Sequence, residues 1–353
     1  MHVGEAGLVV TSPAPRTAWE AAVAADPDCL VSQSPAWRDA VFADHAYADA
    51  SRSYEFGAGR QVLLPLARRR ILPGLPVLAS WPPGWEVAGP ICPDGRISES
   101  QAAAILADVA GLGALSAEIR LRPGADEHWL AAATPPWRVE RRSCYVLDLQ
   151  GGFGVVWSSR FRSSARRAVR KAERSPIEVE VGRSEQLLDA FYGLYQQSIR
   201  RWAAQQHEPA WLARLQLTRE LTRARLQQVA EHFGDSCTVW LARLGGQPAA
   251  ATIVLEAGRY AKYWRGAMDK ELAGPVRASN LLHRLAIERA CDRGYRWYDM
   301  GFGDEPQLVA FKTTLGALAL DTYSLRRERL PIRSARLSAE RLVKQLIGFR
   351  KPA

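Results

Sequence analysis

Residues 295–316 read YRWYDMGFGDEPQLVAFKTTLG and combine three local signals in one short stretch. The first six residues are rich in aromatic side chains, which is typical of a short strand. A glycine-rich turn with acidic side chains follows, and an amphipathic segment then carries Lys312 and stops at Gly316. Core packing alone does not require this order. An acidic, glycine-rich turn that leads to a half-buried lysine is one way to build a site for developing negative charge.

The composition is that of a globular protein with room for two cores. The chain has 353 residues, of which 47% are hydrophobic and 24% charged, and a single core rarely grows to this length. Its formal net charge of +10 favours polyanionic partners such as nucleic acid, nucleotide phosphates or anionic lipid. A GC-biased genome that enriches arginine would produce the same excess of positive charge, and both explanations stay open.

Cysteine usage and hydropathy indicate the compartment. Five cysteines are dispersed at positions 29, 92, 144, 237 and 291, and no two have C-x-x-C spacing. This pattern predicts free, buried thiols in a reducing environment, without a metal site or a catalytic dithiol. The first residues lack the apolar core of a signal peptide, and no run reaches the roughly 20 apolar residues of a membrane span. We therefore expect a cytoplasmic protein.

The order of predicted elements indicates an α+β protein with two similar lobes. The first half alternates helices at 16–26, 34–45, 98–111 and 126–133 with strands at 50–56, 61–70, 117–121 and 138–149, around an ordered loop passage at 72–94. The second half places helices at 155–175, 185–203, 209–233 and 279–293 among strands at 178–181, 237–244, 248–256, 259–268, 295–300 and 320–326. We expect each lobe to be a mixed sheet flanked by helices.

A glycine cluster at 151–154 marks the expected domain boundary. It gives an N-terminal lobe at 1–150, a C-terminal lobe at 151–330, and a basic C-terminal helix at 331–353. The two halves share no visible sequence identity, so the duplication is inferred from element order alone.

Basic side chains gather on the helix predicted at 155–175. Apolar residues recur at helical spacing on one face, and arginines form a row four residues apart on another. Because a row of like charges destabilises a helix, it needs counter-charge from the fold or from a ligand. A phosphate-contacting helix and a solvated face paired with acids are equally open explanations. The candidate donor-binding residues are Arg162, Arg166, Arg167, Arg170 and Lys171.

A second candidate anion site is the start of the helix at 279–293. Ser279 or Asn280 can cap this helix, and Arg277 precedes it. The free backbone N–H groups and the positive dipole end of a helix start attract anions. An ordinary helix cap is the alternative.

Three motifs resemble the FemAB-like branch of the GCN5-related N-acetyltransferase (GNAT) superfamily. They are the basic helix ending in Lys171-Ala-Glu173, the helix-glycine-strand element ending in Asp299-x-Gly301, and Phe311-Lys312-x-x-x-Gly316. The resemblance spans roughly residues 150–328, and a weaker one covers 34–90. The glycine-rich pyrophosphate loop of coenzyme-A-using members is absent, and residues 274–279 are only a loose counterpart. This departure disfavours acetyl-CoA as the donor.

The resemblance implies two GNAT-like lobes and transfer of an activated acyl group to an amine. It assigns Lys312, held by Phe311, to stabilising the negative charge that develops when an amine attacks an ester; a surface lysine is the alternative. Asp304 and Glu305 are candidate proton acceptors if they are partly desolvated. Tyr263, Arg265 and Trp37 are candidate substrate-lining residues. No Ser-His-Asp or Cys-His arrangement is suggested, so direct transfer is favoured over a covalent intermediate.

Three functional hypotheses follow. The first is an aminoacyltransferase that takes its donor from aminoacyl-tRNA and acts on a cell-wall precursor or a small peptide or nucleoside natural product. The second is an acyl-CoA-dependent N-acyltransferase. The third is a non-catalytic GNAT scaffold that binds nucleic acid or membrane through basic helices. For the first we expect tRNA as partner and no cofactor besides the co-substrate; the oligomeric state is not predicted.

Overall fold

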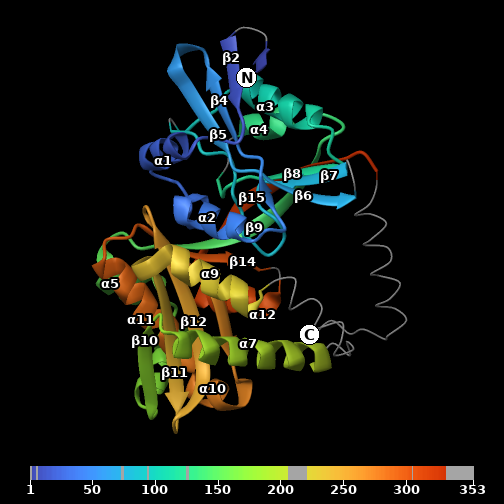
Figure 1. Ribbon diagram of the computed structural model, residues 1–353. Coiled ribbons are helices and arrows are strands. Elements are labelled where there is room, and N and C mark those ends of the chain that lie inside the picture. The colour runs from blue at the N-terminus through green and yellow to red at the C-terminus, as the bar shows by residue number, and fades with distance from the viewer. Residues whose placement is uncertain are drawn as a thin grey trace. The chain divides into compact units, whose positions relative to one another are not determined.

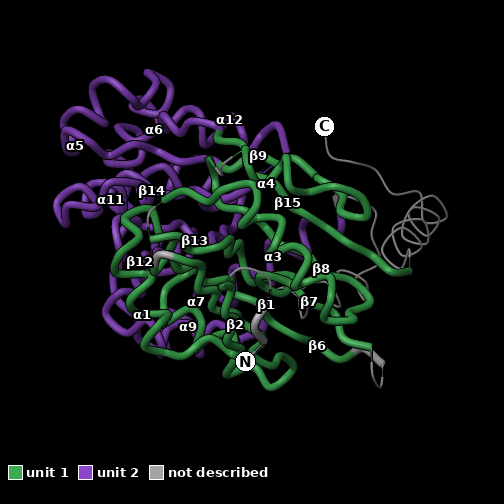
Figure 2. Tube along the Cα trace, turned by 90° about the horizontal axis from the view of Figure 1, so that it is seen from above, with its two compact units in different colours: residues 1–144, 320–332 green, residues 145–319, 333–353 purple. Residues whose placement is uncertain are grey.

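The computed structural model (Figure 1) describes residues 2–4, 7–72, 75–93, 95–124, 127–205, 221–303 and 305–330. The chain divides into two compact units, coloured separately in Figure 2: unit 1 comprises residues 1–144 and 320–332, and unit 2 residues 145–319 and 333–353. Most of the last strand, β15 (Leu318–Glu328), therefore belongs to unit 1, whereas the sequence placed a strand at 320–326 in the second lobe. The predicted helix at 331–353 lies outside the described residues.

Unit 1 contains a small antiparallel sheet and a second group of strands. The small sheet has the order β1 (His2–Gly4), β2 (Leu8–Thr11), β4 (Arg52–Phe56) and β5 (Arg60–Leu64). The second group has the order β8 (Ser116–Arg120), β7 (Leu75–Ala79), β6 (Ala67–Leu72) and β3 (Ala48–Asp49), and β15 pairs with β8. The strand expected at 61–70 is thus two strands, β5 and β6, and the loop expected at 72–94 contains β7.

The described helices of unit 1 begin close to the predicted positions, two of them at capping side chains. They are α1 (Arg16–Ala25), α2 (Pro35–Ala43), α3 (Glu99–Gly111) and α4 (Glu127–Ala132). Ser34 accepts a hydrogen bond from the backbone N of Trp37 at the start of α2, with proline at the next position. Ser98 and Gln101 form a reciprocal capping box at the start of α3. These local signals explain why the predicted helix starts agree with the structure.

The main strands of unit 2 are consecutive neighbours in a larger mixed sheet. Strands β10 (Ile177–Gly182), β11 (Cys237–Leu244), β12 (Gln247–Ala257) and β13 (Tyr260–Met268) form an antiparallel meander, and β14 (Trp297–Phe302) pairs parallel to β13. Residues 249–256 of β12 are all buried, because helices cover both faces of the sheet. Helix α7 (Glu185–Gln205) crosses in front of the strands in Figure 1. Helix α9 (Arg223–Phe233) lies within the predicted segment 209–233, of which residues 209–220 lie outside the described residues.

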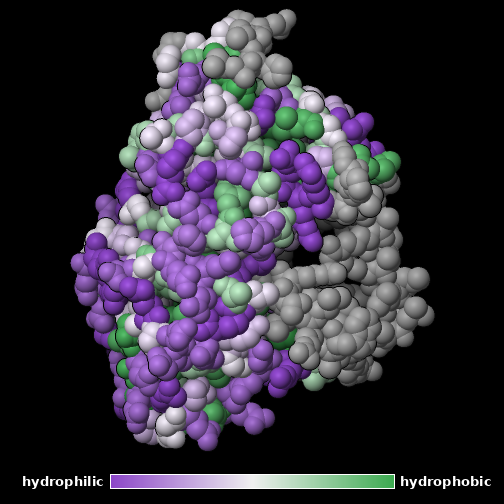
Figure 3. Space-filling view, in the orientation of Figure 1, coloured by the Kyte–Doolittle hydropathy of each residue, from purple (hydrophilic) through white to green (hydrophobic). Residues whose placement is uncertain are grey.

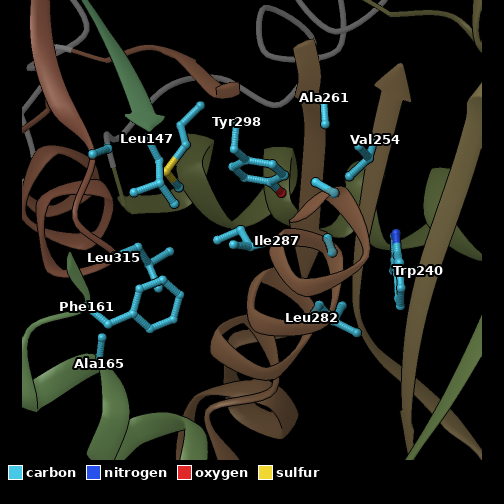
Figure 4. Packing of buried hydrophobic residues seen from close by; sticks show 14 of the residues in the cluster. Leu147, Phe161, Ala165, Trp240, Val254, Ala261, Leu282, Ile287, Tyr298 and Leu315 are labelled. Carbon is cyan, nitrogen blue, oxygen red and sulfur yellow. The ribbon is translucent and has the colours of Figure 1, made fainter. Parts of the chain in front are cut away.

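The other face of this sheet carries α11 (Ala278–Asp292) and the main core of unit 2. Figure 4 shows Leu282 and Ile287 of α11 pointing toward Trp240, Val254 and Tyr298 of the sheet. These residues have at most 7% of their surface exposed. The core therefore fixes the N-terminal end of α11, which carries candidate anion-binding residues, relative to β14, which leads into the glycine-rich turn.

The basic segment predicted as one helix at 155–175 is broken. It consists of α5 (Gly152–Val155), a π-helical turn η4 (Val156–Arg160) and α6 (Ser163–Glu173). Phe161 leaves the helix in an extended conformation and its side chain enters the core, beside Leu315 in Figure 4. The backbone N of Arg162 donates to the carbonyl of Thr314 over 2.8 Å. The break thus ties the start of α6 to the end of α12 (Pro306–Thr314).

Gly316 follows α12 at a position where a side chain has no room. Its φ is +85°, and a Cβ there would lie 2.6 Å from the carbonyl oxygen of Arg160. We expect Gly316→Ala to lower the free energy of unfolding by about 2–3 kcal/mol, measured by urea denaturation, because it adds backbone strain and a steric clash. Gly294→Ala is the matched control, since Gly294 has φ +78° but nothing within 4 Å of its Cβ position. Equal losses in both variants would contradict the role of the close approach to Arg160.

The residues that the structure describes include no candidate membrane-spanning helix. No described helix is both long and apolar enough to cross a bilayer. In the view of Figure 3, hydrophilic residues cover most of the described surface and hydrophobic residues lie in small separate areas.

Candidate active site

Lys312 lies on α12 and is buried beside the end of β14. Only 1% of its surface is exposed. Its Nζ donates to the carbonyl oxygens of Gly301 over 3.1 Å and Phe302 over 2.7 Å, and lies 5.3 Å from the ring centroid of Tyr145. A buried ammonium is tolerated only when such acceptors replace water. The side chain is therefore more deeply buried than the half-buried lysine expected from the sequence, and it is held in one place.

A second buried lysine lies beside the same turn. Lys262 of β13 and Asp299 of β14 are register partners at the last pair of the parallel ladder. Their side chains are 4% and 9% exposed, and Nζ lies 2.8 Å from Oδ2. The other oxygen of Asp299, Oδ1, accepts from the backbone N of Gly301 over 2.7 Å. Asp299 therefore holds the end of the strand through both of its carboxylate oxygens.

The ladder between β13 and β14 ends at this pair. The two strands pair only over residues 260–262 and 297–299, although both continue beyond them. Trp264 interrupts the pairing of β13 with β12, where the register shifts by one residue. Bulges of this kind bend a strand and are frequent next to active sites. The parallel strands therefore diverge at the level of the Lys262–Asp299 pair.

His283 of α11 is packed among aromatic rings. Its ring centroid lies 4.6 Å from that of Tyr263 and 5.2 Å from that of Phe311, and its Nδ1 lies 3.3 Å from the hydroxyl of Tyr298. Burial, with a smaller contribution from the charge of Lys312, lowers the pKa of His283 to about 3. Burial also raises the pKa of Tyr263 to about 12. Both side chains are therefore neutral near pH 7, and His283 is not a source of positive charge in this site.

A groove of about 420 Å³ lies between α6, the start of α11 and α12. It is lined by Ser164, Ala165, Arg167, Ala168, Lys171, Arg277, Asn280, Phe311 and Thr314. Its three cationic side chains are exposed. Arg277 has a left-handed backbone, with φ +59°, where α11 begins. Cations around the start of a helix form a suitable environment for phosphate groups.

The structure brings together five of the residues predicted from the sequence. Arg167, Lys171, Arg277, Asn280 and Phe311 all line the groove. They come from three elements that lie far apart in the chain. Phe311 and Lys312 are adjacent on α12, yet Phe311 faces the groove whereas the Nζ of Lys312 is held at the turn after β14. Helix α12 thus links the groove to the buried lysine.

Other predicted donor-binding residues lie outside this lining. Arg162, which directly precedes α6, and Arg170 on α6 are both exposed. Ser279 is half-buried at the start of α11, and its hydroxyl lies 3.5 Å from the sulfur of Met268. Arg166 donates to the carbonyls of Trp157 and Ser158, each over 3.1 Å, and also to that of Phe161. Its guanidinium therefore stabilises the end of the π-helical turn, where the sequence predicted contact with a ligand.

The predicted substrate-lining and proton-accepting residues are scattered. Trp37, for which the sequence predicted a substrate-lining role, has no exposed surface and packs edge-on against Trp85 in unit 1. Tyr263 packs on His283, and Arg265 donates to the carbonyl of Trp264 over 2.9 Å. Asp304 lies outside the described residues.

Glu305 precedes the first residue of α12 and is exposed. It therefore lacks the partial desolvation on which its predicted role as a proton acceptor depended.

The sequence analysis did not assign Lys262 or Tyr145 to the site. A lysine inside the aromatic run Tyr260-Ala-Lys262-Tyr-Trp264 is a recognisable signal, because a strand flanked by aromatic residues rarely buries a charge without a partner. Its partner Asp299 is likewise enclosed by Tyr298 and Met300. Tyr145 gave no comparable signal.

Comparisons with known proteins agree with this architecture. Residues 159–313 match the family model described as an acetyltransferase (GNAT) domain. No curated protein matches the chain. Among solved structures, the crystal structure of FemX is similar with a TM-score of 0.65 at 10% identity, covering 89% of this chain and 96% of that chain.

Two further structures are similar over nearly their whole length. The C-terminal domain of a putative lysylphosphatidylglycerol synthetase from Agrobacterium fabrum has a TM-score of 0.52 at 13% identity, with coverage of 94% of this chain and 98% of that chain. A tandem GNAT protein from the clavulanic acid biosynthesis pathway has a TM-score of 0.51 at 15% identity, with coverage of 92% and 99%. Identities this low show a shared fold.

The matched residues include Lys312, strands β13 and β14 and all of the groove lining except Thr314, so the candidate site lies in the part of the chain that is similar to a GNAT acetyltransferase domain. The fold of the chain is that of FemX. The predicted fold class, α+β with two GNAT-like lobes, is confirmed by the same structural similarity.

Proposed function

We propose that this protein transfers an aminoacyl group from aminoacyl-tRNA to an amine and so forms an amide bond. The single observation that supports this donor best is the basic groove between α6, α11 and α12. Arg167, Lys171 and Arg277 provide positive charge for a polyanion, while Phe311 provides a flat apolar surface on which a base or sugar can pack. The proposed acceptor is a cell-wall precursor or a small peptide or nucleoside natural product that carries an amine.

The buried lysine supports the chemistry of this reaction. When the amine attacks the ester carbonyl, a tetrahedral oxyanion forms; its collapse breaks the ester C–O bond and leaves the ribose hydroxyl oxygen with negative charge. An ammonium fixed in a site of low dielectric constant stabilises either charge more than water does. Lys312 has the required fixed position, because two carbonyl oxygens hold its Nζ. The reacting ester would enter where β13 and β14 diverge.

Acyl-CoA is the alternative donor for the same groove, but the segment at the start of α11 fits coenzyme A less well. Coenzyme A also carries phosphates, so basic residues alone do not choose between the donors. The glycine-rich loop of coenzyme-A-using relatives is replaced here by residues 274–279, which include Pro275 inside the short helix α10 (Lys270–Val276). Because proline has no N–H, this segment offers fewer backbone donors to a pyrophosphate. We therefore favour aminoacyl-tRNA over acyl-CoA as the donor.

A donor screen tests the proposal. We expect the purified protein to transfer a labelled amino acid from at least one charged tRNA to an amine, and RNase treatment to abolish the transfer. The Lys312→Met variant serves as a reference for uncatalysed transfer. Transfer from acyl-CoA that RNase does not affect would overturn the proposed donor in favour of the second hypothesis. If neither donor supports transfer, the scaffold hypothesis is favoured.

A further inference from the structure

We propose that the buried Lys262–Asp299 ion pair is a positioning element that fixes the Gly301 peptide and, through it, the ammonium of Lys312. This inference rests on the role proposed above for Lys312. A continuous series of contacts carries it. Lys262 Nζ lies 2.8 Å from Asp299 Oδ2, Asp299 Oδ1 accepts from Gly301 N over 2.7 Å, and Gly301 O accepts from Lys312 Nζ over 3.1 Å.

Each group in this series has little freedom to move. The side chains of Lys262 and Asp299 are both at least nine-tenths buried, and the pair sits at the last rung of the β13–β14 ladder. Gly301 has a left-handed backbone with φ +68°, a conformation that few other residues adopt. The bidentate use of Asp299 therefore selects this unusual turn, which aims the Gly301 carbonyl at Lys312.

Stability alone does not account for such a pair. Replacement of a buried ion pair by apolar side chains of similar size is often neutral or stabilising, because both charges are removed from water. A fold that needed only packing at this position would use two apolar residues. The pair is useful where the orientation of a carbonyl matters, and the carbonyl here is one of the two that hold the Lys312 ammonium.

Amine labelling tests this relay, the series of contacts from Lys262 through Asp299 and Gly301 to Lys312, without an activity assay. We expect a soluble acylating reagent, read out by peptide mass spectrometry, to label Lys312 slowly in the wild-type protein and about tenfold faster in Asp299→Asn, because the loosened turn opens more often. The exposed Lys270 is the internal reference. Asp235→Asn is the matched control, since this carboxylate is also ion-paired but 97% exposed. Unchanged labelling of Lys312 in folded Asp299→Asn would overturn the proposal.

A second variant keeps the test informative if Asp299→Asn fails to fold. Lys262→Met combined with Asp299→Leu removes both charges and is expected to stay folded. It also removes the acceptor of Gly301 N, so the labelling of Lys312 is again expected to rise about tenfold. Folded protein with wild-type labelling would refute the relay.

Kinetics then separate the relay from the proposed function. We expect Asp299→Asn to lower kcat about 10- to 100-fold with a donor KM within about twofold of wild type, because a small displacement of a catalytic group is costly. In the Lys312→Met background, Asp299→Asn should have no further effect on kcat. Additive losses would refute the relay, whereas near wild-type turnover of Lys312→Met alone would refute the proposed role of Lys312.

Discussion

Replacement of Lys312 by methionine is expected to lower kcat for acyl transfer by about 100- to 1,000-fold, the range seen when one preorganised donor to a developing oxyanion is removed. Methionine keeps most of the volume of the side chain and removes only its charge and its hydrogen bonds. The donor KM should change little, since Lys312 is buried and the groove is lined by other residues. Steady-state kinetics with the donor identified by the screen measures both quantities.

The folded state of this variant must be compared with wild type, because the carbonyls of Gly301 and Phe302 lose a donor. Circular dichroism and urea denaturation provide that comparison. Lys270→Met is the matched control, since Lys270 is exposed on the same unit, and it should retain wild-type kcat. Turnover of folded Lys312→Met near the wild-type level would show that Lys312 does not stabilise the transition state.

The fold was predictable wherever local chemistry determines the structure. The capping box of Ser98 and Gln101 sets the start of α3, and Gly294, with φ +78°, follows the end of α11. The break at Phe161 and Arg162 was not predictable in the same way. The apolar spacing continues through it, and the contact that stabilises it, from Arg162 N to the carbonyl of Thr314, joins residues about 150 positions apart. Local periodicity does not encode such a contact.

The residues of the candidate site were likewise predictable only where local sequence patterns identify them. The motif resemblance pointed to Lys312, and the basic pattern of α6 pointed to Arg167 and Lys171, which line the groove. The same pattern also included Arg166, because sequence spacing does not show that its guanidinium turns back to the carbonyls of the preceding turn. Lys262 was overlooked because its partner lies 37 residues away on a neighbouring strand. Pairings across a sheet depend on register, which the sequence specifies only indirectly.

Charge reversal in the groove is the second change with a large expected effect. We expect Arg167→Glu or Lys171→Glu to raise the donor KM about tenfold each, and about 100-fold together, with kcat at saturation within about twofold of wild type. The two residues lie four apart on α6 and face the same groove, so they are expected to contact neighbouring phosphates. Loss of these contacts should also reduce the slope of log KM against log salt concentration by about one for each residue.

The control must carry the same change in charge at a site away from the groove. Arg183→Glu meets this condition, because Arg183 directly follows β10, is 51% exposed and pairs with an exposed carboxylate. It should shift the donor KM by less than about twofold, since long-range effects on exposed charges are screened at physiological salt. If Arg183→Glu weakens donor binding as much as Arg167→Glu does, net charge alone governs association and the groove is not the donor site. If kcat falls in the groove variants while KM is unchanged, these residues act on the chemical step, and the separation between a binding groove and a buried catalytic lysine is wrong.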